Sequence, residues 1–439
     1  MRVLCLYNVN LDAVHTLDGA RLSQLILEEG FRTGPDMPDM PETIGSAEDF
    51  LSALLACMDR GIGAELMVES RDAAEFIERS FDWSCRMGGN AGNMANVLGQ
   101  LGAEVVVNVP SLTPEQASFF HPGTRVPLVK NGDATLLPPA EAAEEGEDLT
   151  HFVLQFEEGT KVETAGGAIT TPRENRFIAT FDPLNTRLHL DPGIDTYCKH
   201  YLDDLDGILV SGFHLAPFQS PEGWGYRDVL EDEIEMINRW KRSRPALYVH
   251  VELGDFQDAE IMRYLIGNLR VDSLGMNEDE LGTIEDIGQG WRGLLKATVR
   301  LWSRHKVRRV CVHTREFSIS VSDGHIRPED EIDALTYGAD VAAALVATGE
   351  VMKKPKIEGL KVSAIGSAAA DDLSGEGTRW GRGAYAIRDD QTVCLVPSLI
   401  CERPKVTVGI GDAMTAAVYY REVEAMIGYE ESRSTIGPS

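Results

Sequence analysis

The chain has 439 residues, of which 43% are hydrophobic and 25% are charged, and its formal net charge is −29. This length predicts a large buried core, with one big domain and a smaller one appended or inserted. The acidic surface repels nucleic acids and anionic membranes, so we expect neither as a partner. A phosphate site must therefore be built locally, from arginine, lysine, a metal ion or backbone N–H groups.

The chain shows no sign of a membrane span or an export signal. No apolar run approaches the roughly 18 residues that a span needs, and the first strand-like segment, 3–7, leaves no room for a signal peptide. The seven cysteines are odd in number and form no CxxC pair, which favours reduced thiols and no structural zinc. We expect a cytoplasmic protein, and the sequence indicates no oligomeric state.

Short apolar runs rich in β-formers alternate with helical patterns along the chain. The predicted strands are 3–7, 105–109, 208–211, 247–251, 273–276, 310–313 and 405–408, and the predicted helices are 91–101, 227–241, 259–269, 291–304, 332–349 and 413–426. This alternation predicts an α/β fold with a mostly parallel central sheet between helices. In such folds, ligands bind outside the carboxyl ends of the strands.

A different pattern interrupts this alternation. Residues 64–69 and 151–156 alternate apolar and polar side chains, and 176–181 is a third strand-like run. Half-exposed antiparallel strands have this pattern. We predict a smaller, mostly β lid that is built from excursions out of the main domain. The lid covers roughly 11–32, 62–85 and 150–181, and the large domain covers mainly 1–10, 86–149 and 182–439.

Two polar motifs in the first hundred residues suit a sugar site. Asn10 and Asp12 follow the first strand and offer acceptors for hydroxyls, although an Asx turn is the commoner cause of such a pentapeptide. Gly89 and Asn90 open an alanine-rich helix, where glycine permits close approach of a ligand and the amide can bind hydroxyls. Tight packing of the helix on the sheet explains the glycines about as well, and their spacing is not that of the dinucleotide fingerprint.

Other motifs suit phosphate and metal. Arg173 and Arg176 are candidates for clamping phosphate, although ordinary salt bridges explain each arginine alone. His250 and Glu252 share one face of a predicted strand, and Glu280 follows Asn277 by three residues at the start of a helix. Oxygen ligands of this kind suit Mg²⁺. The alternatives are a satisfied histidine at a strand end and a capping-box variant for the Asn-x-x-Glu pattern.

The most informative motif is Gly409-Ile410-Gly411-Asp412, between a predicted strand and a predicted helix. The glycines bring backbone N–H groups close to an oxyanion, and the helix N-terminus adds unpaired donors and the positive end of its dipole. Asp412 could take a proton from a hydroxyl beside the phosphate. A strand-to-helix turn with an aspartate cap is very common, so the four residues alone favour that alternative.

In combination, six ordered motifs resemble those of the ADP-dependent phosphofructokinase/glucokinase family, within the ribokinase-like superfamily. They are NVNLDAV (8–14), MGGNAGNMAN (87–96), PRENRFI (172–178), YVHVEL (248–253), SLGMNEDEL (273–281) and TVGIGD (407–412). The resemblance covers essentially the whole chain. It implies a large Rossmann-like three-layer domain with a smaller, mostly β lid. It also implies an enzyme of sugar metabolism that transfers the β-phosphate of ADP to a sugar hydroxyl and releases AMP, in a modified glycolysis.

The resemblance also implies roles for individual residues. Asp412 resembles the catalytic base, and Gly409 and Gly411 resemble the turn that holds the transferring phosphoryl group. Glu252 and Glu280, with Asp412, would hold Mg²⁺ or another divalent cation. The implied contacts to the sugar are Asp12, Asn10, Gly89, Asn90 and His151, with Glu65 as a further candidate. The implied contacts to the nucleotide are Arg176, Arg173 and Gly411.

The acceptor sugar is less well determined. Fructose 6-phosphate is the first expectation, with glucose phosphorylation or dual activity as alternatives. Glu157 and Glu158 follow the predicted strand 151–156, where the family often has lysine in an E-F-K-like run, and this weakens the case for a phosphorylated sugar. An ATP-dependent ribokinase-type kinase shares the chemistry of the G-x-G-D motif. A non-catalytic sugar- or nucleotide-binding regulator is the alternative of another class, although a binder would not need the base.

Overall fold

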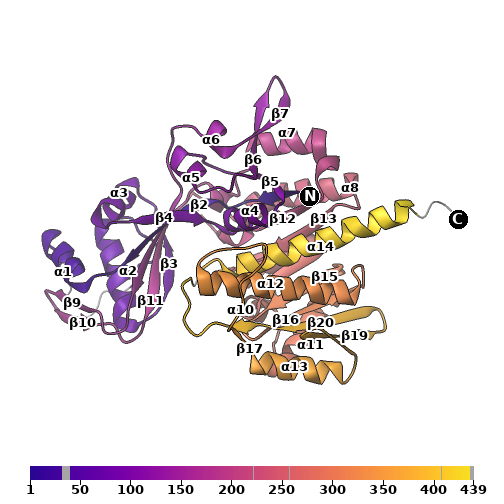
Figure 1. The fold of residues 1–439 in the computed structure, drawn as a ribbon. Helices are drawn as coiled ribbons and strands as arrows, with labels where there is room; N and C mark the ends of the chain where they lie inside the picture. The colour runs from indigo at the N-terminus through magenta and orange to yellow at the C-terminus, as the bar shows by residue number, and fades with distance from the viewer. Residues whose placement is uncertain (32–39, 221, 257, 407, 436–439) are drawn as a thin grey trace.

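A computed structural model describes residues 1–31, 40–220, 222–256, 258–406 and 408–435. Its large unit is built on a twelve-stranded sheet (Figure 1), with the order β18-β19-β20-β16-β15-β14-β13-β12-β1-β5-β6-β7. The strands are β1 (Arg2–Leu6), β5 (Glu104–Val107), β6 (Thr124–Lys130), β7 (Asp133–Leu137), β12 (Gly207–Val210), β13 (Tyr248–Glu252), β14 (Ser273–Asn277), β15 (Arg309–His313), β16 (Phe317–Ser322), β18 (Thr378–Trp380), β19 (Gly383–Arg388) and β20 (Gln391–Pro397).

The centre of this sheet is parallel and both of its faces are covered. All neighbours from β6 through β5, β1, β12, β13 and β14 to β15 pair in parallel, and antiparallel strands flank them. Within β1, Leu4 and Leu6 belong to one buried cluster and Val3 and Cys5 to another. A strand with both faces buried needs a continuous apolar run, and β1 has one. The predicted α/β fold with a mostly parallel central sheet is confirmed.

Helices pack on both faces of the sheet and give it three layers. Residues of α8, α9, α11 and α13 join the Leu4 cluster, and residues of α4 and α14 join the Val3 cluster. The helices of the large unit are α4 (Asn90–Leu101), α5 (Pro114–Ser118), α6 (Pro139–Ala142), α7 (Pro192–Tyr201), α8 (Tyr226–Ser243), α9 (Ala259–Asn268), α10 (Glu278–Ile284), α11 (Gly290–His305), α12 (Pro328–Thr348), α13 (Ala364–Ser374) and α14 (Ile410–Thr435). A two-stranded ribbon joins β17 (Lys361–Val362) to β21 (Leu399–Ile400).

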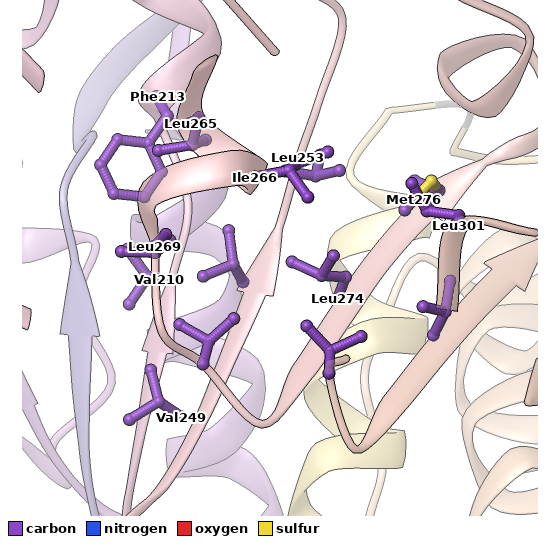
Figure 2. Close-up of a cluster of buried hydrophobic side chains, with 14 of the residues drawn as sticks. Val210, Phe213, Val249, Leu253, Leu265, Ile266, Leu269, Leu274, Met276 and Leu301 are labelled. Atoms are coloured by element: carbon purple, nitrogen blue, oxygen red, sulfur yellow. The ribbon is translucent and has the colours of Figure 1, made fainter. Parts of the chain in front are cut away.

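Figure 2 shows how the apolar layer fixes the strand ends that reach the site. Leu265, Ile266 and Leu269, in and just after α9, lie over side chains of β12, β13 and β14, including Val249 and Leu274. This packing holds the ends of β13 and β14 in place. The polar residues that follow in the chain are therefore positioned by a rigid, close-packed core.

The small unit is a five-stranded sheet in the order β3-β11-β8-β2-β4. Its strands are β2 (Asn10–Thr16), β3 (Ala64–Met67), β4 (Ser84–Gly88), β8 (Thr150–Phe156) and β11 (Asn175–Phe181), and a ribbon of β9 (Lys161–Thr164) and β10 (Gly167–Thr170) accompanies it. The sheet is mixed, because β2 pairs parallel with β8 and β3 pairs parallel with β11. The antiparallel expectation is wrong for these pairs, since they join strands that lie far apart in the sequence, which leaves room for crossover connections.

Three helices cover one face of the small sheet. They are α1 (Gly19–Glu28), α2 (Ala47–Arg60) and α3 (Arg71–Ser80), and they share a buried cluster with β8 and β11. The predicted lid segments contribute the strands but omit α2, whose buried face includes Phe50, Leu54 and Met58. Residue 32 of the first predicted segment lies outside the described residues. The lid boundaries themselves stay a prediction.

A buried ion triad joins the sheet of the large unit to its two longest helices. The Arg309 Nε of β15 lies 2.9 Å from Glu331 Oε1 of α12, and Arg309 Nη2 lies 2.8 Å from Glu422 Oε1 of α14. The second contact is an ion pair rather than an aligned hydrogen bond. All three side chains are buried. Because buried charges are costly when unpaired, this triad fixes how α14 sits on the sheet.

Replacing Arg309 should destabilise the large unit strongly. Arg309→Met leaves two carboxylates buried without their cation, so we expect the free energy of unfolding to fall by about 3–5 kcal/mol in denaturant titrations. The matched control is Arg308→Met, since Arg308 pairs with Asp323 at the surface, where the side chains are 46% and 41% exposed. It should cost less than about 1 kcal/mol. Equal small losses in both variants would contradict the account.

Candidate active site

A cavity of ≈ 790 Å³ lies between the two sheets. On the large unit it is lined at the carboxyl ends of β1, β13, β14 and β15, where Asn8, Glu252, Asn277 and His313 stand. Ligand sites of open parallel sheets occur at this edge. The site residues predicted from the sequence line the cavity, with the exceptions of Arg173 and His250.

The N-terminus of α14 opens into this cavity. Gly409 has φ 72°, a backbone conformation that favours glycine, and its carbonyl accepts the first helical hydrogen bond, from Ala413 N at 3.0 Å. Since the hydrogen bond from Ala413 is the first of the helix, the N–H groups of residues 410–412 have no acceptor inside the helix. They lie at the positive end of the dipole of a long helix, which suits an anion such as phosphate.

The predicted strand 405–408 is wrong. Lys405, Val406 and Val408 have no strand structure, and Thr407 lies outside the described residues. The Lys405 N–H instead donates to the Val346 carbonyl near the end of α12, at 2.8 Å. The helix also begins at Ile410 rather than at Ala413. Asp412 therefore lies inside the first helical turn, where a carboxylate interacts favourably with the dipole.

Asp412 is buried, with 8% of its surface exposed, and two amides hold it. Asn90 Nδ2 donates to Asp412 Oδ1 at 2.8 Å, and Asn93 Nδ2 donates to Asp412 Oδ2 at 3.0 Å. Burial raises the pKa of Asp412 to about 6, although the two amides oppose this change. Its carboxylate is ionised at neutral pH and is more basic than an ordinary aspartate, as a general base requires.

Glu252 ends β13 and is held by two imidazoles. His313 Nε2 lies 3.0 Å from Glu252 Oε1, and His250 Nε2 lies 3.3 Å from Glu252 Oε2. Burial opposes ionisation of this carboxyl, but the hydrogen bonds outweigh it and lower the pKa of Glu252 to about 2. Ser273 Oγ, on the neighbouring strand, lies 2.8 Å from His250 Nδ1 and fixes that ring. His250 is thus a satisfied histidine that also orients the carboxylate.

Asn277 and Glu280 form a capping box at the start of α10. Asn277 Oδ1 accepts from the Glu280 N–H, and Glu280 Oε2 accepts from the Asn277 N–H, both at 2.9 Å. Both residues also line the cavity. Burial, with the nearby charge of Glu252, raises the pKa of Glu280 to about 7. The structural and the ligand-binding explanations of this motif are therefore compatible.

The donors that these residues offer to a divalent cation are carboxylate oxygens. Among the described residues, no group of three or more His, Cys, Asp or Glu side chains could hold a metal ion by itself. Mg²⁺ needs less, since it keeps several waters and binds through one or two carboxylates together with substrate phosphates. The charge of Glu252 raises the proton affinity of Glu280, and a cation beside the two carboxylates would relieve this repulsion. Glu252 and Glu280 therefore fit Mg²⁺.

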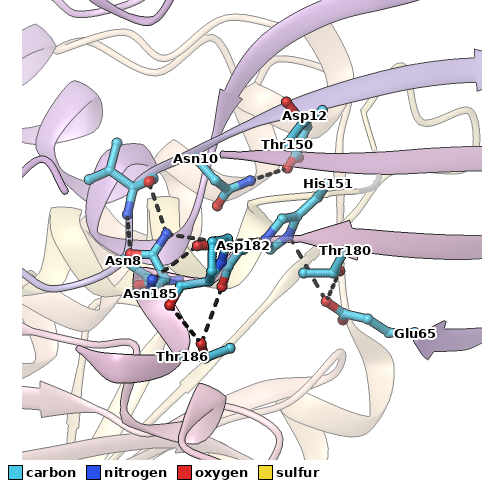
Figure 3. Close-up of polar contacts among 12 residues, drawn as sticks. Asn8, Asn10, Asp12, Glu65, Thr150, His151, Thr180, Asp182, Asn185 and Thr186 are labelled. Carbon is cyan, nitrogen blue, oxygen red and sulfur yellow. Dashed lines mark hydrogen bonds and ion pairs between the residues drawn. The ribbon is translucent and has the colours of Figure 1, made fainter. Parts of the chain in front are cut away.

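The small unit contributes its own polar network to the cavity (Figure 3). His151 Nε2, on β8, lies 3.0 Å from Asp182 Oδ2, and Thr180 Oγ1 donates to Glu65 Oε1 at 2.7 Å. Asn10 Nδ2 donates to Asp12 Oδ1 at 3.1 Å. Burial opposes the charged form of His151, but Asp182 outweighs it and raises the pKa of His151 to about 9. The site thus receives a cation from this side.

The same network ties together two of the crossings between the units, from β1 to β2 and from β11 to the short helix η1 (Asn185–Arg187). Asn185, in η1, donates through Nδ2 to the Val9 carbonyl at 3.0 Å and to Asp182 Oδ2 at 2.6 Å. Val9 lies on the crossing from β1 to β2, and Asp182 follows β11 on the return crossing. The two crossings are therefore held as one hinge.

Of the two predicted arginines, one lines the cavity and the other does not. Arg176, on β11, lines the cavity with an exposed side chain, so it can reach an anionic ligand. Arg173 does not line the cavity, and its Nε donates to the Gly61 carbonyl at 2.5 Å. Glu157 and Glu158 also lie outside the cavity, in an exposed turn after β8.

The model of the ADP-specific phosphofructokinase/glucokinase conserved region matches residues 1–421 of this chain. The chain belongs to that family. A relative named ADP-specific phosphofructokinase, from Methanosarcina acetivorans, is 30% identical over 94% of this chain and 91% of its own length. A relative named ADP-dependent glucose/glucosamine kinase, from Pyrococcus furiosus, is 28% identical over 96% and 94%.

Solved structures of the ADP-specific phosphofructokinase/glucokinase family have the same fold. One, titled an ADP-dependent kinase complex with fructose-6-phosphate and ADPβS, is 25% identical, covers 96% of this chain and 93% of its own, and has a TM-score of 0.76. A hypothetical ADP-dependent phosphofructokinase from Pyrococcus horikoshii has a TM-score of 0.83 at 22% identity, with coverage of 96% and 97%. The predicted family, fold and ADP-dependent sugar kinase activity are confirmed. Within the described residues, no helix has the length and apolarity to cross a membrane.

Sequence reasoning missed one contact to the predicted base and undervalued another residue. Asn93 contacts Asp412, yet MGGNAGNMAN directs attention to its glycines and to Asn90. Its signal was the helical spacing, since residues 90 and 93 share one face. His313 ends the predicted strand 310–313, where a polar residue is common, and it contacts Glu252.

The ion pair of His151 and Asp182 should make stability depend on pH. Folding raises the pKa of His151 from an unfolded value of about 6.5, so its contribution is complete below that pH and is lost as pH rises through about 9. At pH 6.5 we expect wild type to have a larger free energy of unfolding than His151→Gln. This difference should shrink by on the order of 3 kcal/mol when the pH is raised to 9.5. His200→Gln, at an exposed pair with Asp133, is the control. A constant difference for His151→Gln would refute the pair's role.

Proposed function

We propose that this enzyme phosphorylates fructose 6-phosphate with ADP, forming fructose 1,6-bisphosphate and AMP, and that Asp412 is the general base. The observation that carries the proposal is the position of the Asp412 carboxylate, beside the N–H groups at the start of α14. A proton acceptor and an anion site adjoin there in one cavity. In-line phosphoryl transfer needs this combination.

The transfer itself requires few covalent events. The Asp412 carboxylate accepts the proton of the sugar hydroxyl, and the hydroxyl oxygen attacks the β-phosphorus of ADP. The bond from that phosphorus to the bridging oxygen breaks, and AMP leaves with the electron pair. The N–H groups of residues 410–412 and the Arg176 guanidinium stabilise charge on the transferring phosphoryl oxygens. Gly409 and Gly411 give the phosphate access to that backbone.

A divalent cation, for which Mg²⁺ is the best fit, would be held by Glu252 and Glu280 together with substrate phosphates. When bound, it would supply positive charge that neutralises the phosphates of ADP. Asp412 is left out of this ligand set in the proposal, because a cation bound to its carboxylate would lower the proton affinity that a general base needs. Its sequence-based assignment to the metal is replaced by the role of base alone.

The small unit would act as a lid over the sugar. Asp12, Asn10 and His151 line the cavity from its strands, and Gly89 and Asn90 line it from the large unit. The imidazolium of His151 provides positive charge on the sugar side of the cavity. Closure would exclude water, which otherwise competes as the acceptor.

Fructose 6-phosphate is preferred over glucose on two grounds. Glu157 and Glu158, which counted against a phosphorylated sugar, lie outside the cavity, so they do not weigh against it. The Methanosarcina relative carries the phosphofructokinase name. Glucose, or activity on both sugars, is the second candidate, because Glu65 lines the cavity and offers an acceptor for neutral hydroxyls.

Product analysis tests the substrates. The protein is incubated with Mg²⁺, with ADP or ATP, and with fructose 6-phosphate, glucose or no sugar. We expect AMP and fructose 1,6-bisphosphate in equal amounts with ADP, and slower turnover of glucose. Turnover with ATP alone would overturn the ADP assignment. Faster turnover of glucose would replace the preferred sugar, and no turnover of any sugar would favour a binding protein.

The pH profile of kcat/KM tests the base. With a pKa of about 6 for Asp412, protonation removes the base, so kcat/KM should fall about tenfold per pH unit below that value and level off above it. Asp412→Asn should lower kcat at least ~10²-fold at pH 7.5 and leave the KM for ADP nearly unchanged. In Asp412→Asn, the pH dependence of kcat/KM that comes from the substrates' own phosphates should persist. The fall in kcat/KM that comes from protonation of Asp412 should disappear. Near-normal activity of Asp412→Asn would remove it from the role of base.

A further inference from the structure

Helix α4 directs two asparagine amides at one carboxylate on α14. Asn90 and Asn93 are three residues apart, on one face of α4, and each donates to a different oxygen of Asp412, at 2.8 Å and 3.0 Å. With both oxygens engaged, the plane of the carboxylate is fixed. A base that must meet a hydroxyl in line with phosphorus depends on such fixed geometry.

The first of these amides is itself held. Asn8 Nδ2 donates to Asn90 Oδ1 at 3.2 Å, and Asn8 Oδ1 accepts from the Ala91 N–H at 3.4 Å. Asn8 lies between β1 and β2, on the crossing into the small unit. A chain of hydrogen bonds therefore runs from the hinge, through Asn90, to Asp412.

The second amide lies against the anion-binding turn. A side-chain carbon at Gly409 would stand 3.5 Å from Asn93 Nδ2 and 3.9 Å from Asp412 Oδ2. Asn93 and Asp412 therefore adjoin the turn at Gly409, where the absence of a side chain leaves the backbone accessible to a phosphate. Carboxylate, amide and N–H groups adjoin within one small region.

We propose that Asn93, together with Asn90, is a positioning residue that acts on the reaction by orienting the Asp412 carboxylate. The proposal rests on the proposed function, since it takes Asp412 as the base. It also changes the role expected for Asn90 from the sequence, because the Asn90 amide nitrogen donates to Asp412 and its oxygen accepts from Asn8. Asn93 contributes to turnover through Asp412 and adds little to binding of ADP or sugar.

Asn96 provides a matched control on the same helix. It is one turn beyond Asn93 and equally half-buried, but its Nδ2 donates to the Phe119 carbonyl at 2.9 Å and its Oδ1 accepts from the His121 N–H at 2.8 Å. Those bonds hold a loop and do not reach Asp412. Substitution at Asn96 should therefore affect stability and leave the catalytic parameters unchanged.

The test is a double-mutant cycle on the full-length enzyme, with ADP, Mg²⁺ and fructose 6-phosphate or glucose. Asn93→Leu keeps the shape of the side chain and removes the donor. We expect kcat to fall about 10- to 100-fold, the effect of one hydrogen bond to a charged group, with both KM values within about threefold. In the Asp412→Asn background, the same change should lower kcat less than about threefold, because the group it orients is gone. Asn96→Leu should leave kcat within about twofold.

The outcomes separate the positioning role of Asn93 from the assignment of Asp412 as the base. If kcat of Asn93→Leu is normal, or its loss is the same in the Asp412→Asn background, the positioning role is refuted while the proposed function stands. If Asp412→Asn itself is nearly fully active, the base assignment fails first. Asn93→Asp, which has the same shape but places a like charge beside Asp412, is the second variant if Asn93→Leu does not fold. It should lose at least as much kcat, and normal turnover would equally refute the positioning role.

Discussion

Three carboxylates, Glu252, Glu280 and Asp412, are held at one edge of the large sheet without the help of arginine or lysine. Imidazoles hold Glu252, the Asn277 amide and backbone hold Glu280, and two asparagine amides hold Asp412. The asparagine amides orient Glu280 and Asp412 without cancelling their charge. In a chain of net charge −29, the site therefore retains a concentration of negative charge. A divalent cation held as proposed by Glu252 and Glu280 would offset this charge and allow the phosphates of ADP to enter.

The fold supplies the positive charge from two other directions. The start of α14 contributes backbone N–H groups from within the large unit, and the small unit contributes Arg176 and the charged His151 from the opposite side. The buried triad around Arg309 fixes α14 on the sheet, and the Asn185 contacts join two of the crossings between the units. Closure of the small unit would therefore bring cations toward a site that the large unit has already arranged.

Much of this could be predicted from the sequence. The alternation of apolar runs and helical patterns gives the parallel sheet, because strands such as β1 must be apolar on both faces. The six motifs identify the cavity, since ligand residues follow strands whose carboxyl ends share one edge. The mixed order of the small sheet could not be predicted, because β2 and β8 are brought together by folding of the segments between them. Local pattern also failed at 405–408, where Val346 takes the hydrogen bond that a strand would have made. The contact of Asn93 with Asp412 joins residues more than 300 positions apart. Helical spacing aligns Asn93 with Asn90 but does not identify the carboxylate that they share.

The central claim is that the start of α14 holds the transferring phosphate while Asp412 faces the acceptor hydroxyl. The most direct measurement is a crystal structure of the Asp412→Asn variant with ADP, Mg²⁺ and fructose 6-phosphate. The account predicts the β-phosphate on the N–H groups of residues 410–412 and the acceptor hydroxyl within hydrogen-bonding distance, about 2.6–3.2 Å, of the residue 412 side chain. A β-phosphate bound elsewhere in the cavity, or a sugar whose hydroxyls all lie away from residue 412, would contradict it.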